Sequence, residues 1–443
     1  MGLPCWDVHA HRWVEVAQTK TYVPSRADVN RVLRLVCTPL SADRSQQGKP
    51  KAIETLLVIP QPPDPPPRRR VLLHGNEVAG VDRTNSMASA LGPSPGLTVC
   101  TFNVLADLYA NHDAFYYCPK WALAWNYRRR NLIRDIKKVS ADIFCLQEVQ
   151  EDHFEQWFEP QLDREGYTGV YKRKTREFMG QHGKMDGCAV FYRRDRLAPV
   201  DGQVHAVEFN AIAVRKYGPD PKGDQKRVLN RLLKDNVAQV IIFRLLGTGG
   251  NGAMPHYVCV ANTHIAANID FADVKLWQTQ NLVLEIEQIL QSFAPQAGGM
   301  PVPVIIGGDF NSVPGSPPYM LMAQGYVARD AVKDHDLEGI VSHMPLRHRL
   351  ALQSAHMALS VHTLQPGKYE LDDESALDLP HTNYTEKFKG TLDYIWYSSE
   401  LLEVTALLAL AETEDLSRHS ALPSLQFPSD HLPLAAEFRF RHR

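Results

Sequence analysis

Eight polar side chains that could bind a metal ion or transfer a proton stand in or directly after short apolar runs of the sequence. Four are carboxylates, two are amides and two are imidazoles: Asn103, Glu148, His264, Asp309, Asn311, Asp393, Asp430 and His431. Oxygen ligands of this kind suit a hard divalent cation such as Mg²⁺, which takes few ligands from protein. The sequence therefore predicts a site for such a cation, with histidines available for proton transfer.

Each motif also has a simpler structural interpretation, which its residues alone leave open. Glu148 can be a solvated residue at the end of a strand, and Gly307–Asn311 can be an Asx turn that closes a strand. His264 can be a core histidine, Asn262 a turn residue, and Ser429–His431 a C-terminal turn with a capping Asp. The occurrence of all these features at strand ends within one domain favours a common site.

Short apolar runs recur from Leu97 onward, and polar residues follow or interrupt them. Runs of four to six residues rich in Val, Ile and aromatic residues are typical of buried strands. Between them, Tyr127–Val139 and Val274–Leu290 have helical periodicity. We therefore expect an α/β (α+β) layered domain. The apolar runs are Leu97–Phe102, Ile143–Leu146, Cys188–Tyr192, Tyr257–Ala261, Val302–Ile306 and Leu392–Trp396.

Changes in composition divide the chain into three segments. Residues 1–60 contain short β-prone pieces and predict a small β-rich N-terminal region. Residues 61–96 are rich in Pro, Ser and Gly and predict a linker, so we expect the catalytic domain over 97–443. The proline run at 60–67 favours an extended conformation. We interpret this run as a spacer, with docking into an aromatic groove as the alternative.

The composition excludes several classes of protein. The 443 residues include 48 Lys and Arg against 50 Asp and Glu, so the chain as a whole is not cationic. Basic residues nevertheless gather in Lys120–Lys138 and Tyr171–Arg176, so the near-neutral charge is the sum of basic segments and the acidic residues of the predicted metal site. No apolar run is long enough to span a membrane, and the seven cysteines form no C-x-x-C pair. We expect a soluble cytoplasmic protein without membrane contact, and we leave a nuclear fraction open.

Taken in order, the polar motifs resemble the signature of the endonuclease/exonuclease/phosphatase superfamily. Asn, Gln-Glu, Asn-x-His, Gly-Asp-x-Asn, Asp and Ser-Asp-His all occur between Leu97 and Phe440. Longer stretches resemble the carbon-catabolite-repressor-type poly(A) deadenylases, and Val14–Ser25 is similar to the region ahead of the nuclease in plant and algal members. These longer stretches are Thr101–Asp107, Tyr117–Leu123, Asp186–Phe191, Thr382–Thr385, Gly390–Ile395 and Phe427–His431.

This resemblance implies both a fold and an activity. The fold is a four-layer α/β sandwich nuclease domain, in which two packed β-sheets are flanked by helices. The activity is hydrolysis of mRNA poly(A) tails from the 3′ end, which releases 5′-AMP with the help of two Mg²⁺ ions. Two such ions can neutralise charge on a phosphodiester and lower the pKa of an attacking water.

The resemblance also implies a role for the residues nearest the metal. Glu148 would bind the principal metal, with Asn103 and Asp393 helping around the metal and the phosphate. Asp309 would activate or position the attacking water, and Asn311 would hold the phosphate.

Two histidines and two apolar residues complete the implied site. His431, oriented by Asp430 and, through space, by Asp393, would stabilise the transition state, and His264 would contact the scissile phosphate. Phe388 matches an aromatic residue on which the terminal adenine stacks, with an ordinary core phenylalanine as the alternative. Ile269 stands where animal members carry a proline against the same base, so this departure bears on adenine preference rather than on catalysis.

Two other functions would use the same residues. One is a nucleotide 2′-phosphatase of the same superfamily, and the other is an inactive RNA-binding or scaffold module. The stretches Tyr117–Leu123 and Thr382–Thr385 favour the deadenylase, and no catalytic side chain of the signature is missing. The sequence contains no leucine-rich repeats, through which fungal and animal members join their complex. We therefore expect poly(A) RNA as a partner, and a different contact for any other subunits of a deadenylase complex.

Overall fold

The chain divides into two compact units, Met1–Asp64 and Pro65–Arg443, and the large unit carries the whole predicted site. We describe each unit by itself, from a computed structural model. The residues that the structure describes are 3–7, 12–19, 21–29, 31–68, 70–74, 77–82, 96–175, 183–248, 255–336, 338–342, 344–357 and 381–441.

The small unit is a four-stranded antiparallel sheet, in agreement with the β-rich region that the sequence predicts. Its strand order is β2-β1-β3-β4. A short 3₁₀ helix, Arg26–Asp28, precedes β3, and the Ser25 hydroxyl caps it by accepting a hydrogen bond from Ala27 N. The strands are β1 (Leu3–Asp7), β2 (Arg12–Ala17), β3 (Val32–Cys37) and β4 (Lys51–Leu57).

Two β-sheets form the frame of the large unit. In spatial order, the eight-stranded sheet contains β6 (Glu77–Asp82), β5 (Arg70–His74), β19 (Leu402–Leu408), β20 (Leu434–Phe440), β7 (Gly96–Asn103), β8 (Ile143–Gln150), β10 (Asp186–Arg193) and β9 (Tyr167–Arg173). The six-stranded sheet contains β11 (Leu197–Glu208), β12 (Val237–Leu245), β13 (Tyr257–His264), β14 (Val304–Asp309), β18 (Asp393–Ser398) and β15 (Leu352–Ser354). A separate hairpin joins β16 (Asn383–Tyr384) to β17 (Lys389–Gly390).

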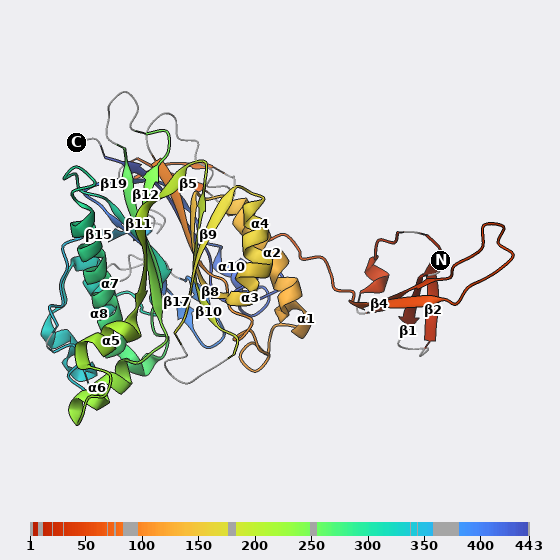
Figure 1. Cartoon of the computed structure of the whole chain (residues 1–443), viewed down its shortest axis with the longest axis horizontal. Helices are drawn as coiled ribbons and strands as arrows, with labels where there is room; N and C mark the ends of the chain where they lie inside the picture. The colour runs from red at the N-terminus through yellow and green to blue at the C-terminus, as the bar shows by residue number, and fades with distance from the viewer. Residues whose placement is uncertain are drawn as a thin grey trace. The chain divides into compact units, whose positions relative to one another are not determined.

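Helices lie outside both sheets, as Figure 1 shows. Among the described residues, none of the helices combines the length and apolar composition that a membrane span needs. The α-helices are α1 (Lys120–Leu123), α2 (Trp125–Val139), α3 (Glu151–His153), α4 (Glu159–Asp163), α5 (Phe209–Tyr217), α6 (Asp224–Leu232), α7 (Ala272–Phe293), α8 (Pro317–Gln324) and α10 (Thr413–Ser417). A π-helix, η2 (Phe154–Phe158), joins α3 to α4, and 3₁₀ helices occur at η5 (Ile269–Phe271) and η6 (Arg329–His335).

Apolar side chains fill the spaces between four stacked layers. One core lies between the two sheets, a second between the eight-stranded sheet and α2, and a third between the six-stranded sheet and α5 to α8. Successive side chains of strand β14 point to opposite faces of the sheet and so enter different cores. Val304 and Ile306 belong to the helix-facing core, whereas Ile305 belongs to the core between the sheets. The predicted four-layer α/β sandwich is therefore confirmed (Figure 1).

Strands β5 and β6 lie inside the range 61–96, for which the sequence predicts a linker. Val71 and Leu73 are buried in the core between the sheets, and β5 pairs with β19. The Arg70 guanidinium forms a buried ion pair with Glu437. The linker prediction is wrong for this part, because a short apolar run gains its strand partner more than 300 residues later in the chain. Residues 83–95 lie outside the described part.

Strand pairing brings the polar strand ends together at one end of the sandwich. In the parallel pair of β7 and β8, Asn103 lies opposite Gln147, and in the parallel pair of β13 and β14, His264 lies opposite Asp309. The antiparallel strand β18 places Asp393 opposite Asp309. Side chains from distant parts of the sequence therefore meet because the carboxyl ends of parallel strands share one edge.

Two glycines allow this close approach. A Cβ atom on Gly308 would lie 2.5 Å from the Thr263 carbonyl oxygen of the neighbouring strand. A Cβ atom on Gly307 would lie 3.1 Å from the Cβ atoms of Thr101 and Cys145, which belong to the other sheet. Glycine is therefore required here for close packing rather than for an unusual backbone angle.

The buried Arg128 of α2 ties together three loops around the polar strand ends. Its Nη1 donates to the carbonyl oxygens of Leu105 at 2.9 Å and Pro428 at 3.2 Å, and its Nε donates to the Leu123 carbonyl at 2.9 Å. Pro428 lies directly before the Ser-Asp-His motif. One guanidinium thus fixes the loop after β7 relative to the segment that carries His431.

Replacement of Arg128 by Lys should destabilise the large unit by about 3 kcal/mol, because an ammonium group cannot reach all these carbonyls and leaves buried acceptors without donors. Urea unfolding followed by tryptophan fluorescence measures this loss. The exposed neighbour Arg130 provides a matched control, and Arg130→Lys should change stability by less than about 0.5 kcal/mol. Equal losses of stability in the two variants would show that the Arg128 hydrogen bonds do not hold these loops together.

Candidate active site

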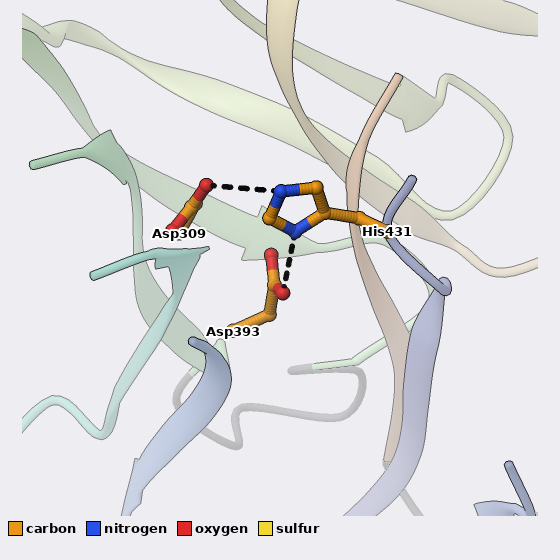
Figure 2. Close-up of side chains that lie close together, drawn as sticks. All are labelled: Asp309, Asp393 and His431. Atoms are coloured by element: carbon orange, nitrogen blue, oxygen red, sulfur yellow. Dashed lines mark hydrogen bonds and ion pairs between the residues drawn. The ribbon is translucent and has the colours of Figure 1, made fainter. Parts of the chain in front are cut away.

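Two carboxylates enclose the imidazole of His431, as Figure 2 shows. Nδ1 of His431 lies 2.8 Å from Asp393 Oδ2, and Nε2 lies 3.7 Å from Asp309 Oδ2. Asp309 and Asp393 are each 1% exposed. Ligand atoms of all three side chains lie within 4.8 Å of one another, which is close enough to share one metal ion.

The Asn103 side chain joins this group to Glu148. Its Nδ2 donates to Glu148 Oε1 at 3.2 Å and to Asp309 Oδ2 at 3.0 Å. The other carboxylate oxygen of Glu148 accepts a hydrogen bond from Ala106 N at 2.9 Å. One amide therefore fixes the spacing between two carboxylates that come from different sheets.

The backbone adopts the left-handed region at three residues of the site. The φ angles are 56° at Leu105, 57° at Glu148 and 47° at Asn311, and none of these residues is glycine. Such angles cost free energy and persist only where surrounding contacts impose them. At these residues the backbone departs from strand geometry, and this departure directs side chains into the site.

Asn311 and His264 lie on either side of Asp309. Asn311 N donates to Asp309 Oδ1 at 2.9 Å, and its Nδ2 donates to the Ile265 carbonyl at 2.9 Å. Nε2 of His264 lies 3.7 Å from Asp309 Oδ2. The Asx-turn interpretation of Gly307–Asn311 is thus correct for the backbone, and the same turn holds Asp309 in the cluster.

Asp430 takes a different place from the one predicted. It does not contact the His431 ring directly, since Asp393 occupies that position. Instead, Asp430 Oδ2 accepts from Asn383 Nδ2 at 3.2 Å, and its charge acts on His431 through space. The histidine is therefore oriented by Asp393 and polarised by three carboxylates.

Burial and charge shift the pKa values of the site in different directions. Burial raises the pKa of Glu148 to about 7, with Lys174 opposing the shift and Asp186 and Asp430 adding to it. Burial lowers the pKa of His264 to about 3, so this imidazole is neutral. Burial alone would lower the pKa of His431, but Asp393, Asp309 and Asp430 outweigh it and raise the pKa well above its ordinary value.

The donor set fits a hard divalent cation. Asp309 and Glu148 present carboxylate oxygens around a shared amide, and Asp393 Oδ1 is buried without a hydrogen-bond partner. Buried carboxylates without a cation are strained by mutual repulsion and desolvation. These residues could therefore hold a divalent metal ion, for which oxygen ligands are preferred.

Phe388 and Ile269 stand apart from the cluster, in exposed positions. Phe388 lies in the turn between β16 and β17 and is 37% exposed, and Ile269 in η5 is 85% exposed. The alternative that Phe388 is a core residue is therefore wrong. A Cβ atom on Gly390 would lie 2.9 Å from the Phe388 ring, so this glycine makes room for the aromatic side chain.

Several residues position the site through contacts that the sequence alone does not predict. Gln147 Nε2 donates to Asn262 Oδ1 at 2.8 Å, and Asn262 Nδ2 donates to the Leu146 carbonyl at 3.0 Å, so the two sheets are linked beneath the cluster. Thr382 Oγ1 donates to Asp393 Oδ2 at 2.7 Å. The turn interpretation of Asn262 is therefore wrong, since its amide binds across the sheets.

Comparison with known proteins places this geometry in a family. Residues 100–431 match the Endonuclease/Exonuclease/phosphatase family. Carbon catabolite repressor protein 4 homolog 1 of Arabidopsis thaliana is 42% identical over 440 residues, which cover 96% of this chain and 70% of that protein. The CCR4-Not complex 3′-5′-exoribonuclease subunit Ccr4 of Mycosarcoma maydis is 32% identical over 86% of this chain and 55% of that protein.

A solved structure agrees with the assignment. The crystal structure of ANGEL2, a 2′,3′-cyclic phosphatase, is similar with a TM-score of 0.61 and 27% identity, and covers 84% of this chain and 97% of that chain. The chain therefore belongs to the endonuclease/exonuclease/phosphatase family and, within it, to the homologues of carbon catabolite repressor protein 4.

Proposed function

We propose that this protein is a Mg²⁺-dependent 3′-5′ exoribonuclease that shortens poly(A) tails and releases 5′-AMP. The observation that carries the proposal is the buried cluster in which Asn103 joins Glu148 to Asp309 while His431 lies between Asp309 and Asp393. It is supported by similarity to a protein named as a 3′-5′-exoribonuclease subunit.

Glu148, Asn103 and Asp393 would hold Mg²⁺, with two ions as the proposed number. Bound Mg²⁺ would offset the charge of the phosphodiester and make a nearby water a better nucleophile at neutral pH. The unpartnered oxygen of Asp393 favours cation binding, because a cation would stabilise this charged carboxylate. A cation would likewise stabilise the ionised form of Glu148, which burial otherwise disfavours.

The chain's own residues would carry the proton and charge transfers. Asp309 accepts the proton of the water whose oxygen attacks phosphorus, and Asn311 helps hold the phosphate. Protonated His431 stabilises the negative charge that develops on the phosphate oxygens. Neutral His264 can donate a hydrogen bond to the scissile phosphate. The bond from phosphorus to O3′ breaks and O3′ takes up a proton from water, which leaves a 3′ hydroxyl on the RNA and 5′-AMP as product.

Adenine preference would depend on Phe388 and Ile269. The exposed Phe388 ring offers a face for base stacking, which contributes about 1 to 3 kcal/mol per base. Exposed Ile269 offers an apolar contact without the rigidity of a proline. We propose poly(A) as the substrate, with discrimination between bases arising from these two side chains.

Two other functions remain as alternatives within this site. Similarity to ANGEL2, a 2′,3′-cyclic phosphatase, and the shared catalytic set make phosphatase activity a second candidate. An inactive scaffold is disfavoured because the described site retains every catalytic side chain of the signature. We further propose action in the cytoplasm and contact with other subunits of a deadenylase complex, since one relative is named as a subunit of the CCR4-Not complex.

Purified protein with Mg²⁺ should release AMP from an RNA that ends in twenty adenines, and Glu148→Gln should lower the rate at least about a hundredfold. Glutamine keeps the shape of the side chain and removes the charge that binds the metal. Glu155 is exposed, so Glu155→Gln provides a control with the same change in charge and should retain the wild-type rate.

The same assay with tails of uridine or cytidine and with NADPH separates the alternatives. Faster release of AMP from the adenine tail supports the deadenylase. Phosphate release from NADPH without RNA shortening would instead identify a 2′-phosphatase, and equal activity of wild type and Glu148→Gln would refute the assignment of Glu148.

Mg²⁺ affinity should weaken about tenfold for each pH unit below about 7 and level off above it. The reason is that Glu148, with a pKa raised to about 7, must lose its proton before it can bind a cation. Calorimetric titration between pH 5.5 and 8.5 measures this slope, which Glu155→Gln should preserve and Glu148→Gln should abolish. Equal affinity at pH 6 and pH 8 would show that Glu148 is not a ligand.

A further inference from the structure

A pocket of about 350 Å³ opens beside the catalytic cluster. Glu148 and His264 form the wall that it shares with the cluster, and its lining also includes Tyr109, Lys234 and Phe271. Ile269, the predicted contact of the terminal base, is not among the lining residues although it belongs to the same short helix as Phe271. The pocket thus adjoins both the catalytic cluster and the short helix that carries Ile269.

Two lysines line this pocket, and their partners differ. Nζ of Lys174 lies 2.7 Å from Asp186 Oδ2, so the charge of Lys174 is balanced within the protein. Nζ of Lys234 lies 4.3 Å from the centre of the Phe271 ring and forms no ion pair with a carboxylate of the described residues. Lys234 is thus held by an aromatic face, and its charge remains available to an anion.

The charges around Lys234 are mixed, because Asp235 also lines the pocket and Arg231 lies over the same aromatic ring. Arg231, which packs over the same ring at 5.0 Å, is already paired with Asp273 through its Nε at 2.6 Å. Burial and Arg231 lower the pKa of Lys234, and this effect outweighs the opposite influence of Asp273 and Asp235. A phosphate oxygen that accepts a hydrogen bond from Nζ would stabilise the protonated lysine.

The chemistry of tail shortening restricts which phosphate this can be. Release of 5′-AMP makes the 5′ phosphate of the terminal nucleotide the scissile one. Every other phosphate of the substrate therefore lies on its 5′ side, in the remaining chain. A second anion site that shares His264 and Glu148 with the catalytic cluster is placed to receive the next phosphate along that chain.

We propose that Lys234, positioned by Phe271, binds the RNA phosphate that lies one linkage 5′ of the scissile bond. This inference rests on the proposed exoribonuclease activity and deepens it by assigning a subsite for the body of the tail. Lys234 then holds the RNA in register for attack, and a substrate too short to supply this phosphate loses the contact.

An RNA that carries an uncharged methylphosphonate at this one linkage tests the assignment. Lys234→Gln should lower kcat/KM about tenfold on the natural RNA and leave it unchanged on the methylphosphonate RNA, because the partner charge is already absent there. Lys226 is exposed and does not line the pocket, so Lys226→Gln is the matched control and should equal wild type on both RNAs. Equal losses on the two RNAs, or no loss on either, would overturn the proposal.

A binding measurement separates this proposal from the proposed activity. If the wild type cleaves no RNA, the exoribonuclease assignment fails, and fluorescence anisotropy of 5′-labelled RNA in the absence of metal then decides the role of Lys234. One lost phosphate contact should reduce the slope of log affinity against log salt by about 0.7 in Lys234→Gln. An unchanged slope, or the absence of RNA binding by the wild type, would overturn the subsite.

Discussion

The burial of several carboxylates beside an imidazole is the constraint on which the rest of this structure depends. Asp309 and Asp393 are almost inaccessible to water, and both lie against His431. Burial of a carboxylate favours its protonated form, and the charges of Asp186 and Asp430 add to this effect, which explains the raised pKa of the neighbouring Glu148. Such a cluster persists only where rigid neighbours hold it, and a bound cation relieves it.

The fold supplies that rigidity through contacts between layers. Gly307 allows the two sheets to approach at the site, and the Gln147–Asn262 hydrogen bond links them beneath it. Arg128 then fixes the surrounding loops through backbone carbonyls. Contacts from both sheets and from α2 therefore hold the site, so the geometry of the carboxylates does not depend on any single loop.

The sequence predicted the elements and the polar strand ends but not the contacts that connect them. The run at Val304–Ile306 is recognisable because both faces of its strand are buried, and the Gly-Asp-x-Asn motif follows directly. Strand β5 was missed, since its partner lies far away in the sequence. The roles of Thr382 and Lys234 were also not predicted, because they come from contacts with Asp393 and Phe271, which only the folded chain brings near.

Hydrolysis of the terminal linkage in water enriched in oxygen-18, followed by mass spectrometry of the products, tests the central claim most directly. Attack of a water held by Asp309 on the terminal phosphodiester predicts one oxygen-18 atom in the phosphate of each released 5′-AMP, with the RNA shortened by one nucleotide at a time. Internal fragments, or label in a 3′ phosphate left on the RNA, would contradict the account.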